Sequence, residues 1–535
     1  MASTTVSNEF KTFAMRSPLI LSVISLLILA AFVRYLLNRP KRLNLPLVGL
    51  PESDDWAKDL IEGTIKYPDT PFFMPTSPPT VMLPISMLDE IKNLPEKKAS
   101  FNELLREVFA GRHTGFGDDR SELVAAVKID LTRNIAGALD GLQNEIKYAL
   151  DKEFGPCYDW TSIELYGKLA RIVALLSGRV FVGRPLSREE EWISSTTEFA
   201  SNAHLARLAI LEWSSWMRPF VAPFLPEIRR LNQHKTRGAE LLTPILKDCL
   251  AKAQGEKSGL EGYEDEQGTM ISWLLNHIDQ KERADALVLG INQMMLSFAA
   301  ISTTSMSICH TIYDLACRPE YVEPLRKEID DVLRQDGYDI DGEGFLKLKK
   351  TSMAKLRKLD SFLKESQRLS PLSIMSNPRV VTSDLTLSTG LVLPKGTHFG
   401  VAAYAVHTSA GTTTYSPSYN PPGAKPPTEF DGFRFSNLRA IKGMENKHQF
   451  VTTSPESLNF GHGNHACPGR FFASNEIKVV CIELLRNWEF RLKGDVERKG
   501  GVDNRPKNDF QEFTIMPNMF AEVDFKRRGE VDLKL

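Results

Sequence analysis

The feature that most constrains this chain is a glycine-rich loop at residues 460–469, which reads FGHGNHACPG and carries a single cysteine, Cys467. Glycines at 461, 463 and 469 permit positive φ angles, so the loop can coil tightly and direct backbone N–H groups towards the sulfur. Such donors favour the thiolate, which is a strong soft ligand for iron. The loop therefore predicts a thiolate metal ligand held on a tight turn.

Two other interpretations of this loop concern the cysteine itself. A lone cysteine is most often a small buried hydrophobic residue. Alternatively, His462, His465 and Cys467 could supply three ligands to a zinc ion. No fourth ligand lies nearby in the sequence, however, and the spacing is tight for a tetrahedral site.

A third interpretation treats the glycines as a nucleotide-binding turn. Gly461-x-Gly463-x-x-Ala466 matches a dinucleotide fingerprint, and Glu483 lies near the distance expected for a carboxylate that binds ribose. That fingerprint requires a buried strand immediately before it. Residues 454–458 read SPESL, which is a poor buried strand, so the match lacks its context.

The spacing F-G-x-G-x-H-x-C-x-G resembles the heme-ligand signature of the cytochrome P-450 family, with every defining position filled. The resemblance implies heme b (iron protoporphyrin IX) as cofactor and Cys467 as the axial ligand of its iron. It also implies that Phe460 and Gly461 lie beside the sulfur and that His465 contacts a heme propionate. Arg379 is the expected second propionate partner. The family's W-x-x-x-R motif is missing around residues 130–133, so no propionate partner is assigned there.

Two further motifs support the resemblance. Glu365 and Arg368 form an E-x-x-R pair whose i,i+3 spacing places both charges on one face of a predicted helix. Arg434 belongs to the sequence FDGFRF, which resembles the family's later arginine motif. By resemblance, these three residues form a buried charged network that stabilises the heme-binding core. Other E-x-x-R sequences, without this helical setting, begin at Glu103, Glu227, Glu323 and Glu483.

A long apolar helix without proline is predicted over residues 284–315, ending before Arg318-Pro319. Within it, residues 298–305 read FAAISTTS, which matches the family's oxygen-pocket segment with one departure. Ser302 occupies the position where the family usually has an acidic residue. Thr303 is therefore the expected hydroxyl that hydrogen-bonds dioxygen and guides protons, with water or another side chain as proton source.

The closest resemblance is to fungal membrane-bound P-450s of terpenoid and secondary-metabolite biosynthesis of the ent-kaurene-oxidase type. It implies a monooxygenase that oxidises a hydrophobic terpenoid or meroterpenoid. Apolar stretches of the sequence suit such a substrate. The residues predicted to line the substrate pocket are Phe298, Ala299, Leu372, Ile374, Met375 and Met516.

The N-terminal region predicts a membrane anchor. Residues 1–17 are expected to be luminal, residues 18–37 to form one transmembrane helix and residues 38–51 a proline-rich hinge. Positive charges at 34, 39, 41 and 42 follow the apolar segment and predict a cytosolic catalytic domain over residues 52–535. By resemblance the membrane is the endoplasmic reticulum. A cleaved signal peptide is the alternative, but the segment starts late and lacks a clear cleavage site.

Overall, the sequence predicts a mainly α fold with a small β lobe, the cytochrome P-450 fold. The net charge of −1 does not indicate a nucleic-acid partner, and the six cysteines show no paired spacing. Since no flavin module is visible, the resemblance implies electrons from an NADPH-cytochrome P-450 reductase, with cytochrome b5 as a second donor. A heme sensor and a P-450-type isomerase or dehydratase remain alternative functions.

Overall fold

The computed structural model describes residues 22–23, 25–26, 29, 43–50, 53, 55–257, 259–260, 268–340, 346–408 and 423–529. The predicted luminal segment 1–17 lies outside the described residues. So does the predicted transmembrane helix 18–37, except for the five isolated positions. The structure therefore concerns the predicted catalytic domain and part of the hinge.

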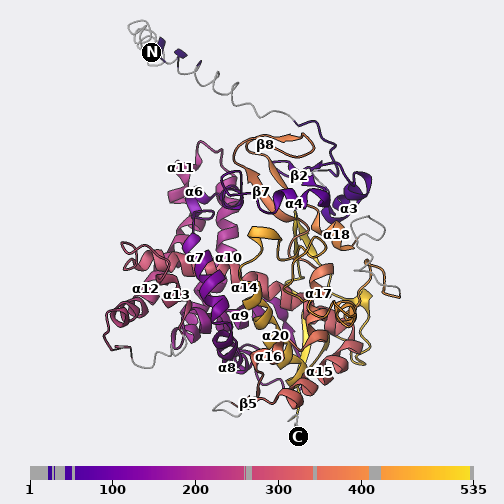
Figure 1. Cartoon of the computed structure of the whole chain (residues 1–535). Coiled ribbons are helices and arrows are strands. Elements are labelled where there is room, and N and C mark those ends of the chain that lie inside the picture. Colours follow the sequence, from indigo (N-terminus) through magenta and orange to yellow (C-terminus); the bar gives the residue numbers. More distant parts are fainter. Residues whose placement is uncertain are drawn as a thin grey trace, which may run out of the picture.

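One long helix, α14 (Ala286–Cys317), crosses the centre of the molecule (Figure 1). It begins two residues later than predicted, where Asp285 accepts a hydrogen bond from the N–H of Leu287, and it ends before Arg318-Pro319. Within the described ranges, α14 is the one helix with the length and hydropathy of a membrane span. Half of its most apolar stretch is buried inside the protein, and these apolar side chains pack in the core.

Five other helices pack directly against α14 and enclose it. They are α9 (Leu165–Phe181), α10 (Glu190–Leu211), α12 (Pro226–Ala253), α17 (Arg357–Leu369) and α20 (Arg470–Asn487). Shorter or more peripheral helices complete the helical part: α3 (Trp56–Lys66), α4 (Leu88–Ile91), α5 (Phe101–Val108), α6 (Gly111–Thr114), α7 (Ser121–Ala125), α8 (Ile135–Phe154), α11 (Arg218–Val221), α13 (Met270–Leu275), α15 (Val322–Asp336), α16 (Lys350–Met353), α18 (Ala403–Thr408) and α19 (Arg434–Arg439).

The β structure is small and divided. The main sheet has the strand order β1-β2-β10-β7-β3, with β10 parallel to β2 and antiparallel to β7. Its strands are β1 (Phe72–Met74), β2 (Thr80–Leu83), β3 (Ala99–Ser100), β7 (Ser376–Val381) and β10 (His398–Val401). A second, antiparallel sheet contains β11 (Trp488–Leu492), β14 (Glu522–Arg527) and β4 (Thr161–Glu164). The three remaining pairs are β5 (Asp339–Ile340) with β6 (Leu346–Lys347), β8 (Leu385–Thr386) with β9 (Val392–Leu393), and β12 (Asp509–Gln511) with β13 (Thr514–Met516).

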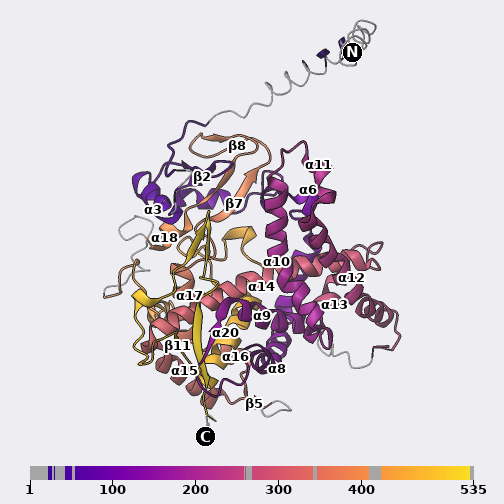
Figure 2. The same cartoon turned by 180° about the vertical axis from the view of Figure 1, so that it is seen from behind.

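The main sheet lies with α3 at one end of the molecule, beside the point where the chain enters the domain, and Figure 2 shows this from behind. The mainly helical fold with small sheets confirms the predicted fold class for the domain. The hinge differs from a free linker, because Pro46 and Val48 exchange backbone hydrogen bonds with Phe73 of β1, at 2.7 and 2.9 Å. The contacts of the domain therefore begin before residue 52.

A buried carboxylate on α17 connects three elements near the cysteine loop. Asp360 pairs with Lys478 of α20 at 2.6 Å and with Arg439 of α19 at 3.1 Å. Its second oxygen also accepts the backbone N–H of Phe450 at 2.9 Å. All three charged side chains are buried, and removing one member of such a cluster leaves uncompensated charge.

We therefore expect Asp360→Ala to lower the free energy of unfolding by roughly 3–5 kcal/mol, because Lys478 and Arg439 would lose their buried anion. Urea unfolding followed by circular dichroism measures this change. The matched control is Glu62→Ala, since Glu62 forms only an exposed 3.9 Å pair with Lys58. Equal stability of the two variants would contradict the assigned role of Asp360.

Candidate heme-thiolate active site

The cysteine loop coils tightly, as predicted, and leads directly into α20. The backbone N–H of Cys467 donates to the carbonyl of Phe460 at 2.7 Å. Gly461 and Gly463 have φ angles of 68° and 81°, a region that favours glycine. At 463 a Cβ atom would also lie 2.5 Å from the Lys92 carbonyl oxygen, so no larger residue fits.

The sulfur of Cys467 is set apart from the other thiols of the chain. Burial raises the pKa of this thiol, while the backbone N–H groups of Gly469 and Arg470 and the Arg470 charge act in the opposite direction. Cys467 is nevertheless the one cysteine of the six that is not buried. A half-buried cysteine whose thiol receives backbone donors fits a metal ligand, because a metal cation stabilises the thiolate.

The central helix α14 presents an open face at the predicted oxygen segment. Ala299 and Thr303, one helical turn apart, are exposed, although most residues of this helix are buried. The Thr303 hydroxyl donates to the Ala299 carbonyl at 2.7 Å, and the Ser302 hydroxyl donates to the Phe298 carbonyl at 2.9 Å. Neither hydroxyl bonds to the other, so Ser302 does not replace the missing acid by direct contact with Thr303.

A carboxylic acid that was not among the site residues predicted from the sequence lies behind this helix. Glu476 of α20 is fully buried, and burial raises its pKa to about 8, so it is neutral at pH 7. Its carboxyl group accepts a hydrogen bond from Ser177 at 2.7 Å and interacts with Thr304, the neighbour of Thr303. No signal in the sequence distinguishes Glu476 from a surface glutamate, because the packing of α20 against helices distant in sequence, among them α9 and α14, buries it.

Basic groups converge beside the cysteine loop. Burial lowers the pKa of His465, and the charges of Arg379 and Lys128 lower it further, while Glu96 acts in the opposite direction. Burial also lowers the pKa of Arg379 to about 10. A cluster with this cationic excess suits a ligand that carries carboxylates, as heme does through its propionates.

Lys128 is a candidate site residue, because its charge acts on His465, and no sequence motif identifies it. It lies in the π-helical segment Ala126–Leu131 that continues α7. The segment packs beside the loop, since a Cβ at Gly469 would lie 3.9 Å from the Val127 side chain. Val124 and Lys128 have the i,i+4 spacing of the absent W-x-x-x-R motif, with valine in place of tryptophan and lysine in place of arginine. This spacing is the one sequence signal that could have identified Lys128.

The structure brings Glu365, Arg368 and Arg434 together in a fully buried network. Glu365 accepts two hydrogen bonds from Arg368, at 2.7 and 2.8 Å, and one from Arg434 at 3.2 Å. The two guanidinium groups also donate to backbone carbonyls, those of His407, Lys425, Pro426, Pro427 and Glu429. The network therefore holds residues 425–434 against α17.

The predicted pocket residues fall into two groups. Phe298 packs edge-on against Phe116 and Phe109, with ring centroids 4.9 and 5.7 Å apart, next to the exposed Ala299. The chain near Leu372 pairs with the β12–β13 hairpin, where Ile515 donates to the Leu372 carbonyl at 3.3 Å. Met375 and Met516 are half-buried there, whereas Ile374 has no exposed surface and packs in the core.

The alternative interpretations of the loop find no support. Within the described ranges, no group of three or more His, Cys, Asp or Glu side chains could hold a metal ion, which argues against a zinc site. Residues 454–458 form a turn and not a strand, and Glu483 is half-buried near the C-terminal end of α20. The loop therefore lacks the strand-turn-helix setting of a dinucleotide site.

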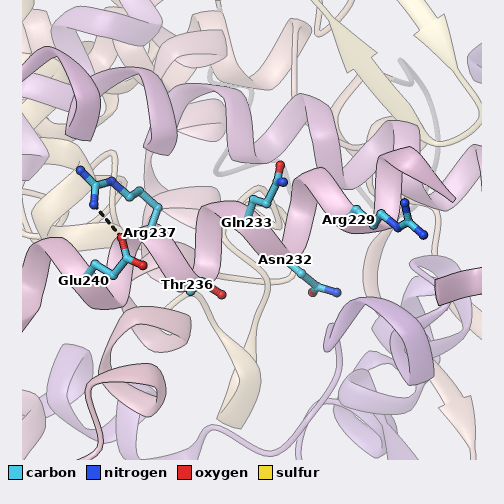
Figure 3. Close-up of a pocket in the computed structure, with 6 residues that line it drawn as sticks. All are labelled: Arg229, Asn232, Gln233, Thr236, Arg237 and Glu240. Carbon is cyan, nitrogen blue, oxygen red and sulfur yellow. Dashed lines mark hydrogen bonds and ion pairs between the residues drawn. The ribbon is translucent and has the colours of Figure 1, made fainter. Parts of the chain in front are cut away.

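A separate groove lies along α12 (Figure 3). All of its lining residues come from this one helix, and they are polar: Arg229, Asn232, Gln233, Thr236, Arg237 and Glu240. Arg237 pairs with Glu240 at 2.6 Å and with Glu191 of α10. The pair with Glu191 connects α12 to α10, and the groove shares no residue with the candidate site.

The accessibility of the thiols predicts a selective labelling pattern. In folded protein prepared without heme, we expect an aromatic disulfide reagent to modify about one thiol per chain, against six after denaturation. Cys467→Ala should reduce the native value to near zero, whereas Cys249→Ser should leave it unchanged. Heme added before the reagent should protect the thiol. Labelling that persists in Cys467→Ala would contradict the assigned accessibility.

Comparison with known proteins agrees with this geometry. The family model for Cytochrome P-450 matches residues 160–501. The chain is 49% identical to the cytochrome P-450 monooxygenase ascG of Acremonium egyptiacum over 532 residues, 99% of each chain. It is also 42% identical over 505 residues to the monooxygenase BOA7 of Botryotinia fuckeliana, covering 92% of this chain and 91% of that protein. It is 40% identical to the cytochrome P-450 monooxygenase 3 of Gibberella fujikuroi over 452 residues, 84% of this chain and 85% of that one. The chain thus belongs to the cytochrome P-450 family of heme-dependent monooxygenases.

Proposed function

We propose that this monooxygenase oxidises a hydrophobic small molecule, a terpenoid or meroterpenoid intermediate of fungal secondary metabolism, at a membrane surface. The observation that carries the proposal is the half-buried Cys467 on the loop before α20, combined with the exposed Ala299–Thr303 face of α14. The helices that hold these groups pack against one another. An apolar aromatic cluster around Phe298 borders the open face and favours a hydrophobic substrate.

The residues of this chain have distinct roles in the proposed reaction. Cys467 would ligate heme iron, Arg379 and Lys128 would neutralise the propionates, and His465 would donate a hydrogen bond to one of them. When bound, heme supplies the dioxygen-activating chemistry, which a thiolate ligand promotes. The Thr303 hydroxyl would hold and pass protons at Oγ1, since it lies on the open face.

Cytochrome P-450 monooxygenases take their electrons from redox partners. We propose an NADPH-cytochrome P-450 reductase as donor here, with cytochrome b5 as a second donor, on the basis of the family resemblance. This pairing places the protein on the endoplasmic reticulum membrane, with residues 18–37 as the anchor and the catalytic domain in the cytosol. A reconstituted assay with purified reductase, with and without cytochrome b5, tests the pairing directly.

The surface around α11 supports membrane association. Three aromatic side chains between α10 and α12 are strongly exposed: Trp216 at 73%, Phe220 at 71% and Phe224 at 72%. Large apolar groups gathered on one surface indicate an interaction site. In Figure 1, α11 lies at the same end of the molecule as the point where the chain enters the domain. An anchor at residues 18–37 would therefore bring this aromatic surface towards the lipid.

The first prediction of this proposal concerns the thiolate ligand. The reduced, carbon-monoxide-bound protein should show a strongly red-shifted Soret band, because the ligand is a cysteine thiolate. Cys467→Ala should abolish that band and reduce turnover to background. Cys481→Ala is the matched control, since Cys481 is a buried thiol on the adjoining helix and its variant should keep the band. A red-shifted band in Cys467→Ala would overturn the assignment.

Oxygen labelling separates the proposed reaction from the alternatives. With reductase, NADPH and ¹⁸O₂, a monooxygenase incorporates one labelled atom into product, whereas an isomerase, dehydratase or heme sensor incorporates none. Candidate substrates can first be ranked by the spectral shift that they cause on binding. Sesquiterpenes and prenylated phenols should bind more tightly than fatty acids of equal carbon number, and the reverse order would contradict the proposed substrate class.

A further prediction of this proposal concerns the aromatic surface around α11. In the full-length protein reconstituted into vesicles that contain brominated lipid, we expect quenching of tryptophan fluorescence, because Trp216 would lie in the interfacial region. Trp216→Phe should remove most of this quenching, whereas Trp488→Phe should not, since Trp488 is fully buried in the domain. Equal quenching in Trp216→Phe and the wild type would show that this surface does not contact lipid.

A further inference from the structure

A small chamber lined by both polar and apolar side chains lies between α14 and α17. Its walls are Ser307, His310 and Thr311 of α14, Leu363, Ser366 and Gln367 of α17, and Ser370, Phe450 and Ile477. The space available to the centre of a water-sized sphere is about 10 Å³. That is roughly the room that one water molecule needs, and polar walls are required to hold it.

One wall of the chamber contains an unsatisfied buried donor. His310 is 1% exposed, and its Nε2 has no hydrogen-bond partner among the described residues. Burial and then the Arg505 charge lower the pKa of His310 to about 3, against the opposing effects of Asp314 and the Ile515 carbonyl. The ring is therefore neutral. Since Arg505 can only donate to Nδ1, at 3.4 Å, this contact favours the tautomer that carries the hydrogen on Nε2.

The chamber continues a stripe of hydroxyl groups that begins at the oxygen segment. Thr303, Ser307 and Thr311 repeat every four residues along one face of α14. The Thr311 hydroxyl donates to the Ser307 carbonyl at 2.8 Å, and the Ser307 hydroxyl donates to the Thr303 carbonyl at 2.9 Å. Ser307 thus connects the exposed Thr303 to the interior, and its oxygen keeps lone pairs free to accept.

Behind the chamber lies a network of buried charge. Asp314, one turn beyond His310, accepts hydrogen bonds from Arg505 at 2.7 Å, Arg318 at 2.9 Å and Ser366 at 2.6 Å. These bonds fix α14 relative to α17 and to the C-terminal segment. The chamber therefore has rigid walls, and an empty chamber would leave the His310 donor unpaired at a cost in stability.

We propose that the chamber binds one ordered water molecule, which accepts a hydrogen bond from His310 Nε2 and donates one to the Ser307 hydroxyl oxygen. Through this water, His310 is a positioning residue for the stripe of hydroxyl groups at Thr303, Ser307 and Thr311. The bound water provides a hydrogen-bonding group behind Thr303 in a helix that has Ser302 instead of an acid. Its effect on the reaction rests on the proposed function, but the water site itself does not.

Two measurements on the full-length holoenzyme test this proposal. A high-resolution crystal structure of the wild type should show water density within hydrogen-bonding distance of His310 Nε2. In turnover, His310→Leu should raise hydrogen peroxide formation relative to product about fivefold, the factor that one lost hydrogen bond of ordinary strength represents. Substrate affinity, measured by the spectral shift, should be unchanged, because His310 lies outside the substrate pocket.

Matched variants separate positioning from packing. His310→Gln retains a side-chain N–H and should recover most of the coupling, whereas Leu363→Met alters the wall of the chamber without removing a donor and should resemble the wild type. A dry chamber in the wild-type structure would overturn the proposal. So would wild-type coupling in His310→Leu, or equal loss in His310→Leu and His310→Gln. If His310→Leu does not fold, the wild-type density and His310→Gln decide the question. Failure of the proposed function would appear separately, as loss of the red-shifted carbon monoxide band in the wild type.

Discussion

The burial of two carboxylates on α17 is the constraint on which the candidate site depends. Asp360 and Glu365 are both buried, and each would destabilise the fold without its basic partners. Asp360 binds residues of α19 and α20, and Glu365 binds Arg368 and Arg434. The elements that flank the cysteine loop can therefore take only one arrangement relative to α17, and Cys467 is held on a rigid frame.

Helix α14 combines two functions that make opposing demands on its sequence. It is the main core helix, so most of its side chains are apolar and buried. It also carries hydroxyls at positions 302, 303, 305, 307 and 311, each of which bonds to the carbonyl four residues earlier. This back-bonding satisfies the hydroxyls without polar neighbours, which is how a polar stripe can exist in an apolar core. Burial keeps the side chains of Glu476 and His310 neutral, so neither adds an unpaired charge to the core.

Much of the domain could be predicted because its signals are local. The helix predicted at 284–315 occurs at Ala286–Cys317. The charged network was predicted from two motifs about sixty residues apart. Lys128, Glu476 and the chamber at His310 were missed, because their environments are created by helices that are distant in sequence. The sequence predicted a proline-rich hinge at residues 38–51, and no local pattern shows that Pro46 and Val48 pair with Phe73.

The sequence by itself determined the chemistry that this protein can perform. Two local arrangements carry that chemistry: a cysteine in a coiled glycine loop, and a pair of hydroxyls in a long apolar helix. The geometry of each follows from its backbone conformation, so residue spacing predicts it without tertiary contacts. Tertiary structure decided the protonation and partners of the groups around them. Burial depends on which helices pack together, and it makes Glu476 a neutral acid, lowers the pKa of Arg379 and leaves His310 facing a space of one water molecule. Desolvation acts across the whole core, so no short stretch of sequence can report it.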